Sequence, residues 1–337
     1  MLFNKFKLIE FNISLILILK CLKNSNQTIY YYMRTEFVEF ESEILHPLLE
    51  MYPKNNRFNI PLWIPDEKET PPKGIVIMIN GFLEGMGETK VKRDKSLKLY
   101  SSIAEKLCEE NIASVFLPMP FHFDRCEDFV DVNLYAPIER LKESGTYLYH
   151  GGYTQVVADV IKLIKLIEKY PAKFGLIDAG FKIHLLGYSL GGVAAIGAAS
   201  ELENKFDSLS ILFSTWNISE INPQSIENMF GSSFNFGSNE WKKTIKELKK
   251  IKPVCSNIFK ELIWGEGETI EFKNCAKRVL FIHGIKDEIF TKEITDQRNE
   301  ALINRLQDCT FINLPSSHIA RLIRNEVAGY VSAFISI

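Results

Sequence analysis

The feature that most constrains this chain is a short glycine-flanked turn, Gly187-Tyr188-Ser189-Leu190-Gly191. An apolar run at 183–186 predicts a buried strand before the turn, and a run of small residues at 191–199 predicts a closely packed helix after it. A serine on so sharp a strand-to-helix turn has strained dihedral angles, and neighbouring backbone passes so close that only glycine fits on either side. The turn would lift the Ser189 hydroxyl clear of the sheet and direct the Leu190 N–H at any anion that forms beside it.

Two interpretations of this turn are open. It is either a glycine-rich connection with an incidental serine or a nucleophile elbow. The bare string G-x-S-x-G is common, but its position between an apolar strand and a small-residue helix favours the elbow. A serine is a weak nucleophile by itself, so this interpretation requires a base and an orienting acid further along the chain.

Length, charge and cysteine spacing exclude several classes of protein. At 337 residues the chain can hold one large α/β domain or two smaller ones. A net charge of -2 gives no reason to expect nucleic acid as a partner. The six cysteines show no C-x-x-C spacing, which argues against a zinc site and a dense disulfide framework. We therefore expect no metal and no cofactor, although four residues of mixed ligand type alternate along one stretch: His122, Asp124, Cys126 and Asp128.

Residues 1–32 form an N-terminal extension with several interpretations. Lysines precede an apolar run at 11–19, which is short for a membrane span and resembles the core of a secretory signal. Glu10 lies in its flank, however, and no A-x-A-like cleavage site follows. We prefer extra residues of little structural consequence, which includes translation from Met33, and keep a signal or membrane contact through residues 1–20 as alternatives. The expected location is the cytoplasm, with export or membrane association as the alternative.

Residues 33–337 alternate between strand-like and helix-like patterns, which predicts one α/β domain. Half-buried strands are expected at 37–40 and 58–64, and Pro61 would place the second toward a sheet edge. A continuous apolar run at 75–79 predicts a parallel strand covered on both faces. The later expected elements are, in order, helix 97–110, strand 112–119, helix 156–167, strand 209–213, strand 278–284, helix 292–306, strand 310–314 and helix 319–337.

Two segments interrupt this rhythm. The connection at 121–152 is long enough to cover or line a site. The segment 217–274 carries apolar residues at helical spacing with lysines between them, and we expect a helical cap insertion there. Its lysines could attract an anionic substrate or a lipid surface, but a solvated helix face is the preferred explanation.

A glycine-rich loop at 80–87 follows the apolar strand 75–79. Such a loop can turn its backbone N–H groups toward the crevice at the carboxyl end of a parallel sheet. In the functional interpretation the N–H of Phe82 or Leu83 is the second donor of an oxyanion hole. In the alternative interpretation the loop is an ordinary connection between strand and helix.

Candidates for the acid and the base lie after the last two strands. Asp287 follows the strand 278–284 and would therefore lie on the same rim as the serine turn. Its competitor is Glu288, and its alternative role is to cap a helix that begins near 291. Of the six histidines, His318 alone combines a position on this rim with the required order in the chain.

The other histidines fit a catalytic role less well. His184 lies within the strand that leads to Ser189, which is typical of a core residue with its polar atoms satisfied. His283 precedes the Asp287 turn, and we expect it to shape that loop. His46, His122 and His150 fall in earlier loops.

The order Ser189, Asp287, His318, with one residue after each of three strands, resembles the α/β-hydrolase superfamily. The G-Y-S-L-G-G elbow, the N-G-F loop after an early strand and H-G-x-x-D before the final histidine are similar as well. The resemblance covers about 75–337, and the cap falls where many members carry a lid. Asn80 stands where histidine is common, and Ser316-Ser317 stand where glycine is frequent. The subfamily therefore stays open among lipases, carboxylesterases, thioesterases and serine aminopeptidases.

The resemblance implies a mostly parallel sheet with helices on both faces, a Ser189–His318–Asp287 triad and acyl transfer to water. It implies no cofactor and, as partner, a small-molecule acyl substrate with an apolar portion. A carboxylic ester is the preferred substrate class, with thioesters and amides open. The alternatives are an acyltransferase of the same fold and a catalytically silent relative that binds a ligand or a protein.

Overall fold

The computed structural model describes residues 33–43, 53–66, 70–81, 90–120, 122–125, 152–177, 180–202, 204–214, 276–291, 308–318 and 323–337. Several predictions from the sequence lie outside these residues: the extension 1–32, the cap 217–274, the helix 292–306 and most of the connection 121–152. Within the described part of the chain, none of the helices combines the length and apolar character needed to cross a membrane. The interpretations of residues 1–32 therefore stay predictions.

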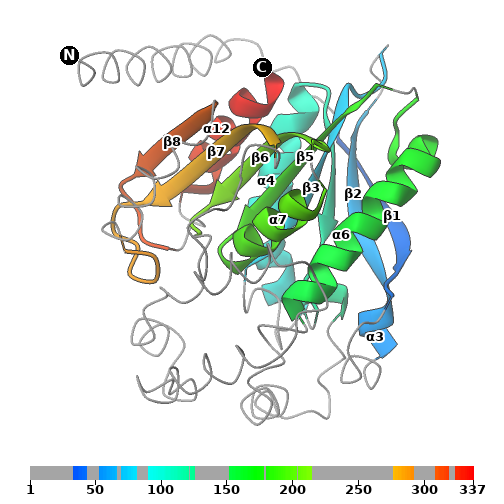
Figure 1. Cartoon of the computed structure of the whole chain (residues 1–337), viewed down its shortest axis with the longest axis horizontal. Coiled ribbons are helices and arrows are strands. Elements are labelled where there is room, and N and C mark those ends of the chain that lie inside the picture. The colour runs from blue at the N-terminus through cyan, green and yellow to red at the C-terminus, as the bar shows by residue number, and fades with distance from the viewer. Residues whose placement is uncertain are drawn as a thin grey trace.

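The described residues form one eight-stranded sheet with the order β1-β2-β4-β3-β5-β6-β7-β8 (Figure 1). The strands are β1 (Met33–Glu41), β2 (Arg57–Pro65), β3 (Gly74–Ile79), β4 (Ala113–Leu117), β5 (Lys182–Tyr188), β6 (Phe206–Leu212), β7 (Ala276–Gly284) and β8 (Cys309–Leu314). The pairs β1/β2 and β2/β4 are antiparallel, and all the other neighbouring pairs are parallel. The carboxyl ends of β3 to β8 therefore all lie along the same side of the sheet, which we call its carboxyl edge.

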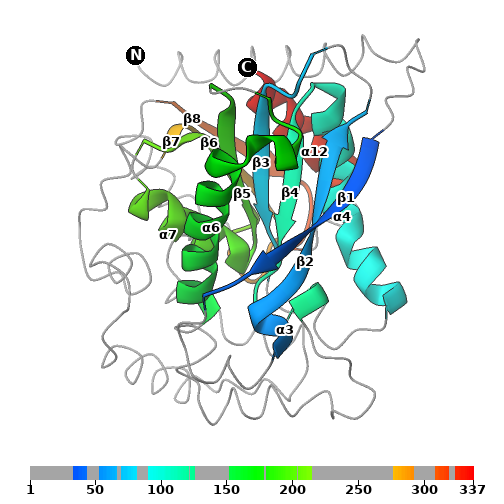
Figure 2. The same cartoon turned by 90° about the vertical axis from the view of Figure 1, so that its right-hand side faces the viewer.

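Helices cover both faces of this sheet. They are α3 (Pro53–Asn56), α4 (Lys90–Glu109), α6 (Gly152–Lys169), α7 (Leu190–Glu201) and α12 (Arg324–Ser336), with short 3-10 helices η1 (Phe123–Arg125) and η3 (Pro171–Phe174). Figure 2 shows α6 and α7 on one face and α4 and α12 on the other. Each face has its own apolar core, with Val160 and Ala195 in one and Ile103 and Val331 in the other.

The pattern of apolar residues explains which strands are central. Every residue of β3 is buried, as a strand with helices on both faces requires. By contrast, β1 is largely exposed, and Phe37 on it keeps 65% of its surface in contact with solvent. β1 is the edge strand next to β2, and these two strands carry the antiparallel pairing of the sheet.

The observed elements confirm the predicted fold class and correct some details of the prediction. Helix α4 begins at Lys90 rather than at 97, because its first turns are rich in lysine and carry no apolar periodicity. The short helix α3 lies directly before β2, in a segment for which no helix or strand was predicted. Pro61 lies one strand in from the edge, opposite Phe37. β4 pairs only with Leu62 and Trp63 of β2, so the N–H that Pro61 lacks interrupts no ladder on that side.

Candidate active site

The serine turn has the strained geometry that its glycines predict. Ser189 has φ 53° and ψ −126°, between the end of β5 and the start of α7. A Cβ on Gly187 would lie 2.2 Å from the carbonyl oxygen of Gly191, and a Cβ on Gly191 would lie 2.3 Å from that of Asn80. Larger residues at either flank would therefore collide with backbone. The Ser189 N–H also donates to the Leu212 C=O at 2.8 Å, which ties the turn to the neighbouring strand β6.

The structure brings Ser189, His318 and Asp287 together at the carboxyl edge of the sheet. Ser189 Oγ lies 2.8 Å from His318 Nε2, and His318 Nδ1 lies 2.8 Å from Asp287 Oδ2. The exposed fractions of the three residues are 7%, 6% and 4%, so these contacts are largely shielded from water. Each ring nitrogen of His318 faces a different partner, and the imidazole bridges a hydroxyl and a carboxylate.

The Asp287 carboxylate is held from behind by its own loop. Its Oδ1 accepts hydrogen bonds from the backbone N–H groups of Ile289 and Phe290, both at 2.9 Å, which leaves Oδ2 for His318. The neighbouring Glu288 is exposed to solvent. The carboxylate thus binds backbone amides at the start of the following segment and orients His318 at the same time.

The loops that carry Asp287 and His318 are bound to each other. The N–H of Ile285 donates to the Leu314 C=O, and that of Lys286 donates to the Ser316 C=O, each at 2.9 Å. A Cβ on Gly284 would lie 2.5 Å from the carbonyl oxygen of Ser316. The glycine of H-G-x-x-D is therefore needed for the close approach of the two loops. Ser316, in the position where glycine is frequent, supplies one of the carbonyl groups in this contact.

Sequence reasoning missed two aromatic residues beside His318. The Tyr188 hydroxyl donates to the His318 backbone C=O at 2.7 Å, and the two rings are stacked with centroids 5.9 Å apart. The Phe290 ring packs on His318 from the Asp287 loop at 5.3 Å. The position of Tyr188, next to the serine within the elbow, is the one signal that could have indicated its contact with the base.

Of the three residues predicted to form an oxyanion hole, the structure describes only Leu190. Leu190 is the first residue of α7, so its N–H has no acceptor within the helix. Phe82 and Leu83 lie outside the described residues, although Gly81 before them is described. A Cβ on Gly81 would lie 2.9 Å from Ser189 Cβ, which shows that this backbone passes directly against the serine.

Two of the remaining histidines are neutral core residues. His184 Nδ1 lies 2.8 Å from Ser208 Oγ, as expected for a satisfied core histidine, and burial lowers the pKa of His184 to about 3. His122 Nδ1 lies 2.7 Å from the Pro120 carbonyl oxygen, and burial lowers the pKa of His122 to about 4. Among the described residues no cluster of side chains is arranged to hold a metal ion.

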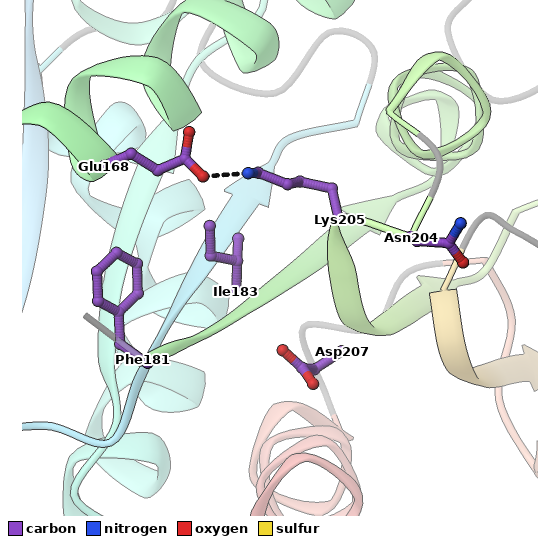
Figure 3. Close-up of a pocket in the computed structure, with 7 residues that line it drawn as sticks. Glu168, Phe181, Ile183, Asn204, Lys205 and Asp207 are labelled. Carbon is purple, nitrogen blue, oxygen red and sulfur yellow. Dashed lines mark ion pairs between the residues drawn. The ribbon is translucent and has the colours of Figure 1, made fainter.

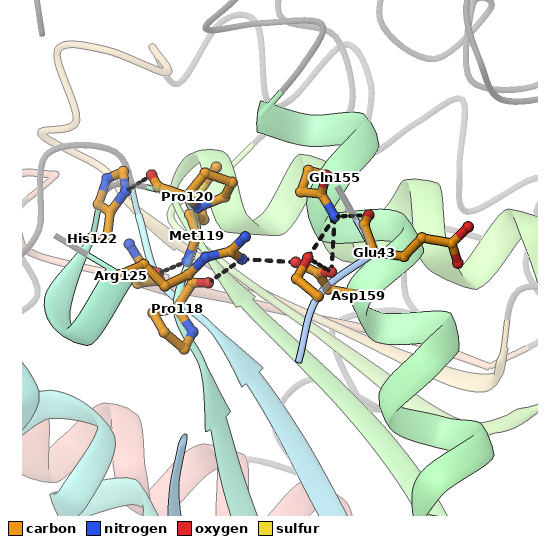
Figure 4. Close-up of polar contacts among 10 residues, drawn as sticks. Glu43, Pro118, Met119, Pro120, His122, Arg125, Gln155 and Asp159 are labelled. Carbon is orange, nitrogen blue, oxygen red and sulfur yellow. Dashed lines mark hydrogen bonds and ion pairs between the residues drawn. The ribbon is translucent and has the colours of Figure 1, made fainter. Parts of the chain in front are cut away.

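A buried ion pair anchors the segment that follows β4 (Figure 4). Arg125 Nη1 donates to Asp159 Oδ2 at 2.7 Å and to the Pro118 C=O at 3.1 Å, and both charged side chains are almost completely buried. Asp159 Oδ1 also accepts hydrogen bonds from Ser42 Oγ and Gln155 Nε2. This cluster joins β4, η1, α6 and the end of β1. Nothing in the sequence indicated it.

A cavity of about 400 Å³ lies at the other end of the sheet (Figure 3). Phe181 and Ile183 line it at the start of β5, and an ion pair between Glu168 and Lys205 lies on its wall. β5 runs from this cavity to the turn at Ser189, so the cavity is separate from the cluster of Ser189, His318 and Asp287. We assign it no part in the chemistry.

No protein-family model matches this sequence, and no curated protein matches it. Many solved structures do match, among them serine hydrolases and esterases, so the chain has the α/β-hydrolase fold. The chain is similar to an esterase of Rhizomucor miehei, with 10% identity, a TM-score of 0.53 and coverage of 90% of this chain and 83% of that one. It is also similar to the esterase Pf2001 of Pyrococcus furiosus, with 14% identity, a TM-score of 0.51 and coverage of 90% and 92%. It is similar as well to the fluorophosphonate-binding serine hydrolase F of Staphylococcus aureus, with 11% identity, a TM-score of 0.50 and coverage of 90% of this chain and 99% of that one. At these identities the likeness concerns the fold alone.

Proposed function

We propose that this protein is a serine hydrolase that cleaves a carboxylic ester, with thioesters and amides as the other substrate classes. The observation that carries the proposal is the 2.8 Å contact between Ser189 Oγ and His318 Nε2, with Asp287 on the other ring nitrogen. A neutral imidazole whose Nδ1–H donates to Asp287 has an unprotonated Nε2. That nitrogen is the general base that a weak hydroxyl nucleophile needs.

The reaction follows from this geometry in two halves. Ser189 Oγ attacks the carbonyl carbon while its proton moves to His318 Nε2, and the carbonyl oxygen becomes an oxyanion. The carbon–oxygen bond to the leaving alcohol then breaks, and His318 gives its proton to that alcohol. In the second half His318 takes a proton from water as the water oxygen attacks the acyl carbon. The bond from that carbon to Ser189 Oγ then breaks, His318 returns the proton to Oγ, and the acid is released. Apart from the substrate and water, the groups that act in these steps are protein side chains and backbone amides, so the proposed mechanism needs no cofactor.

The oxyanion needs hydrogen-bond donors that are fixed before the reaction. The Leu190 N–H at the start of α7 is one donor, and the Phe82 or Leu83 N–H is the second. Each such donor typically lowers the barrier by about 3 kcal/mol. The close passage of Gly81 against Ser189 supports a second donor from the loop after β3.

The substrate side of the proposal is a small acyl compound with an apolar portion. Its support is the apolar group Ile258, Phe259, Leu262, Ile263 and Trp264 in the expected cap, which lies outside the described residues. A chain-length series of p-nitrophenyl esters, with acyl-CoA thioesters beside it, measures this directly. A preference for longer acyl chains in kcat/KM is expected.

A fluorophosphonate probe tests the nucleophile. The wild-type protein should be labelled, and Ser189→Ala should abolish both labelling and ester hydrolysis. Ser200→Ala is the matched control, because Ser200 is also buried on α7 but donates to the Gly197 C=O and not to His318. An unlabelled wild-type protein without hydrolysis of any ester or thioester would overturn the proposal in favour of a binding protein.

A further inference from the structure

The Asn80 side chain forms two hydrogen bonds that fix its orientation. Asn80 follows β3 and is completely buried. Its Nδ2 donates to the Gly81 C=O at 2.7 Å, and its Oδ1 accepts from the Met119 N–H at 2.7 Å. A carbonyl group can only accept and a backbone N–H can only donate, so the two partners determine which way the amide points.

The register of the sheet places this amide beside the elbow. Ile79, the last residue of β3, pairs with Gly187 on one side and with Leu117 on the other. The backbone at 80–81 therefore lies between the serine turn and the segment that follows β4. The backbone carbonyl oxygen of Asn80 is so close to the elbow that Gly191 can carry no side chain.

The bond to Gly81 determines the direction of an N–H group. A trans peptide is planar, and its N–H points opposite to its C=O. Asn80, whose own acceptor contact is to Met119, holds the Gly81 C=O, and this fixes the orientation of that carbonyl group. Gly81 itself lies against Ser189, with a Cβ position 2.9 Å from Ser189 Cβ. An N–H fixed in this way meets the requirement for a preorganised oxyanion donor.

The amide oxygen of Asn80 is bonded to Met119, in a segment that is itself held by buried contacts. Met119 lies in the segment whose Pro118 C=O accepts a hydrogen bond from Arg125, and Arg125 is paired with Asp159 in the buried cluster of Figure 4. His122 N–H donates to the Met119 C=O at 3.1 Å. Asn80 thus connects a well-anchored segment to the backbone beside the nucleophile.

We propose that Asn80 is a positioning residue for the reaction, which holds the peptide after Gly81 so that its N–H stabilises the oxyanion. The inference rests on the proposed serine-hydrolase function. It assigns a role to a side chain that never touches the substrate and acts only through the backbone. Its loss should therefore lower kcat more than it raises KM.

Asn111 provides a matched control at the opposite end of the same two strands. Its Nδ2 donates to the Pro71 C=O at 2.9 Å and to the Thr70 C=O at 3.3 Å, and it lies just before β4. Both asparagines therefore join the connections of β3 and β4, but Asn111 does so at the amino ends, away from Ser189. A purely structural role predicts that each variant loses activity only in proportion to its loss of folded protein.

The experiment compares Asn80→Asp with Asn111→Asp. Each substitution keeps the shape and an acceptor but removes the NH₂ donor. We expect Asn80→Asp to reduce kcat for a p-nitrophenyl ester by about 10-fold to 100-fold with little change in KM, because an oxyanion donor is typically worth about 100-fold or more. Asn111→Asp should leave kcat within about 2-fold of wild type at equal folded fraction. Asn80→Ala, which introduces no buried charge, repeats the test if Asn80→Asp does not fold.

The outcomes separate this inference from the proposed function. An inactive, unlabelled wild-type protein overturns both. An active wild-type protein with kcat unchanged in Asn80→Asp and Asn80→Ala overturns the role of Asn80 alone. Equal losses in the Asn80 and Asn111 variants, following the folded fraction measured by circular dichroism, also overturn it.

Discussion

The hydroxyl of Tyr188 donates a hydrogen bond of 2.7 Å to the backbone C=O of His318. Tyr188 is the residue before Ser189, whereas His318 lies in the loop after β8. One side-chain bond therefore connects the turn that carries the hydroxyl with the loop that carries the imidazole. The separation of the two reacting groups depends on this bond as well as on the sheet.

Tyr188→Phe tests this connection. The variant keeps the ring that stacks on His318 and removes only the hydroxyl. We expect a loss of about 1 kcal/mol in unfolding free energy, as for a typical buried hydrogen bond. We also expect kcat to fall by more than the folded fraction explains, since a small displacement of His318 weakens proton transfer. Tyr100→Phe, which removes a buried hydroxyl on α4, is the control, and an equal effect on kcat there would contradict the prediction.

Asp287→Asn should nearly abolish catalysis because of the way the loop holds the side chain. The N–H groups of Ile289 and Phe290 require an acceptor, so the amide oxygen of the new asparagine should take the place of Oδ1. Its NH₂ then faces His318 Nδ1 and forces the proton onto Nε2, which can no longer accept the proton of Ser189. The expected decrease in kcat is about 10⁴-fold.

Glu288→Gln is the control for this substitution. Glu288 is the adjacent acidic residue but is exposed, and its neutralisation should leave kcat within about 2-fold of wild type. Steady-state hydrolysis of one p-nitrophenyl ester by the two variants decides the matter. Comparable decreases in kcat for both variants would show that catalysis depends on the negative charge of the loop and not on the orientation of His318.

The sequence predicted the serine turn well because its constraint is local. Gly187 and Gly191 lie within two residues of Ser189, and their steric reason is visible in the string itself. The positions of Asp287 and His318 were also predictable, because each lies in the loop that follows an apolar strand. The parallel arrangement of β5, β7 and β8 then brings three distant segments to one edge.

The supporting contacts could not be predicted in the same way, because they depend on strand register. Asn80 meets Met119 only because β4 lies beside β3 with Ile79 opposite Leu117. The ion pair of Arg125 and Asp159 joins η1 and α6, which are separated by a long stretch of chain. No local pattern indicates that two such residues are in contact, and both would be expected on the surface.

Because the Arg125–Asp159 ion pair is buried, neutralising Asp159 should cost the protein far more stability than neutralising a partly exposed acidic residue. Asp159→Asn leaves Arg125 charged and fully buried, so we expect a loss of about 3–5 kcal/mol in unfolding free energy. Glu109→Gln breaks the partly exposed pair with Lys106 on α4 and should cost about 0.5 kcal/mol or less. Urea unfolding followed by circular dichroism measures both. Similar losses of unfolding free energy in the two variants would show that burial of the Arg125 charge does not require Asp159 as its partner.

His184 predicts that the fold loses stability in acid. Burial lowers the pKa of His184 to about 3 in the folded protein, whereas a histidine in an unfolded chain titrates near about 6.5. Between about pH 6.5 and pH 3 the histidine is protonated in the unfolded chain but neutral in the folded protein. The stability of the fold therefore falls as the pH decreases through this range. One such group contributes a slope of up to about 1.4 kcal/mol per pH unit.

His184→Gln should make that slope shallower by about one proton, because glutamine does not titrate. Its amide can still hydrogen-bond to Ser208 Oγ, the partner of His184 Nδ1, so the variant should fold. Urea midpoints between pH 7 and pH 4 give the slope for both proteins. His122 has its pKa lowered to about 4 by burial, so His122→Gln should remove a second, separate proton from the same dependence. If His184→Gln leaves the slope unchanged, His184 must already be protonated in the folded core, and its contact with Ser208 would then be one between a charged donor and a hydroxyl acceptor.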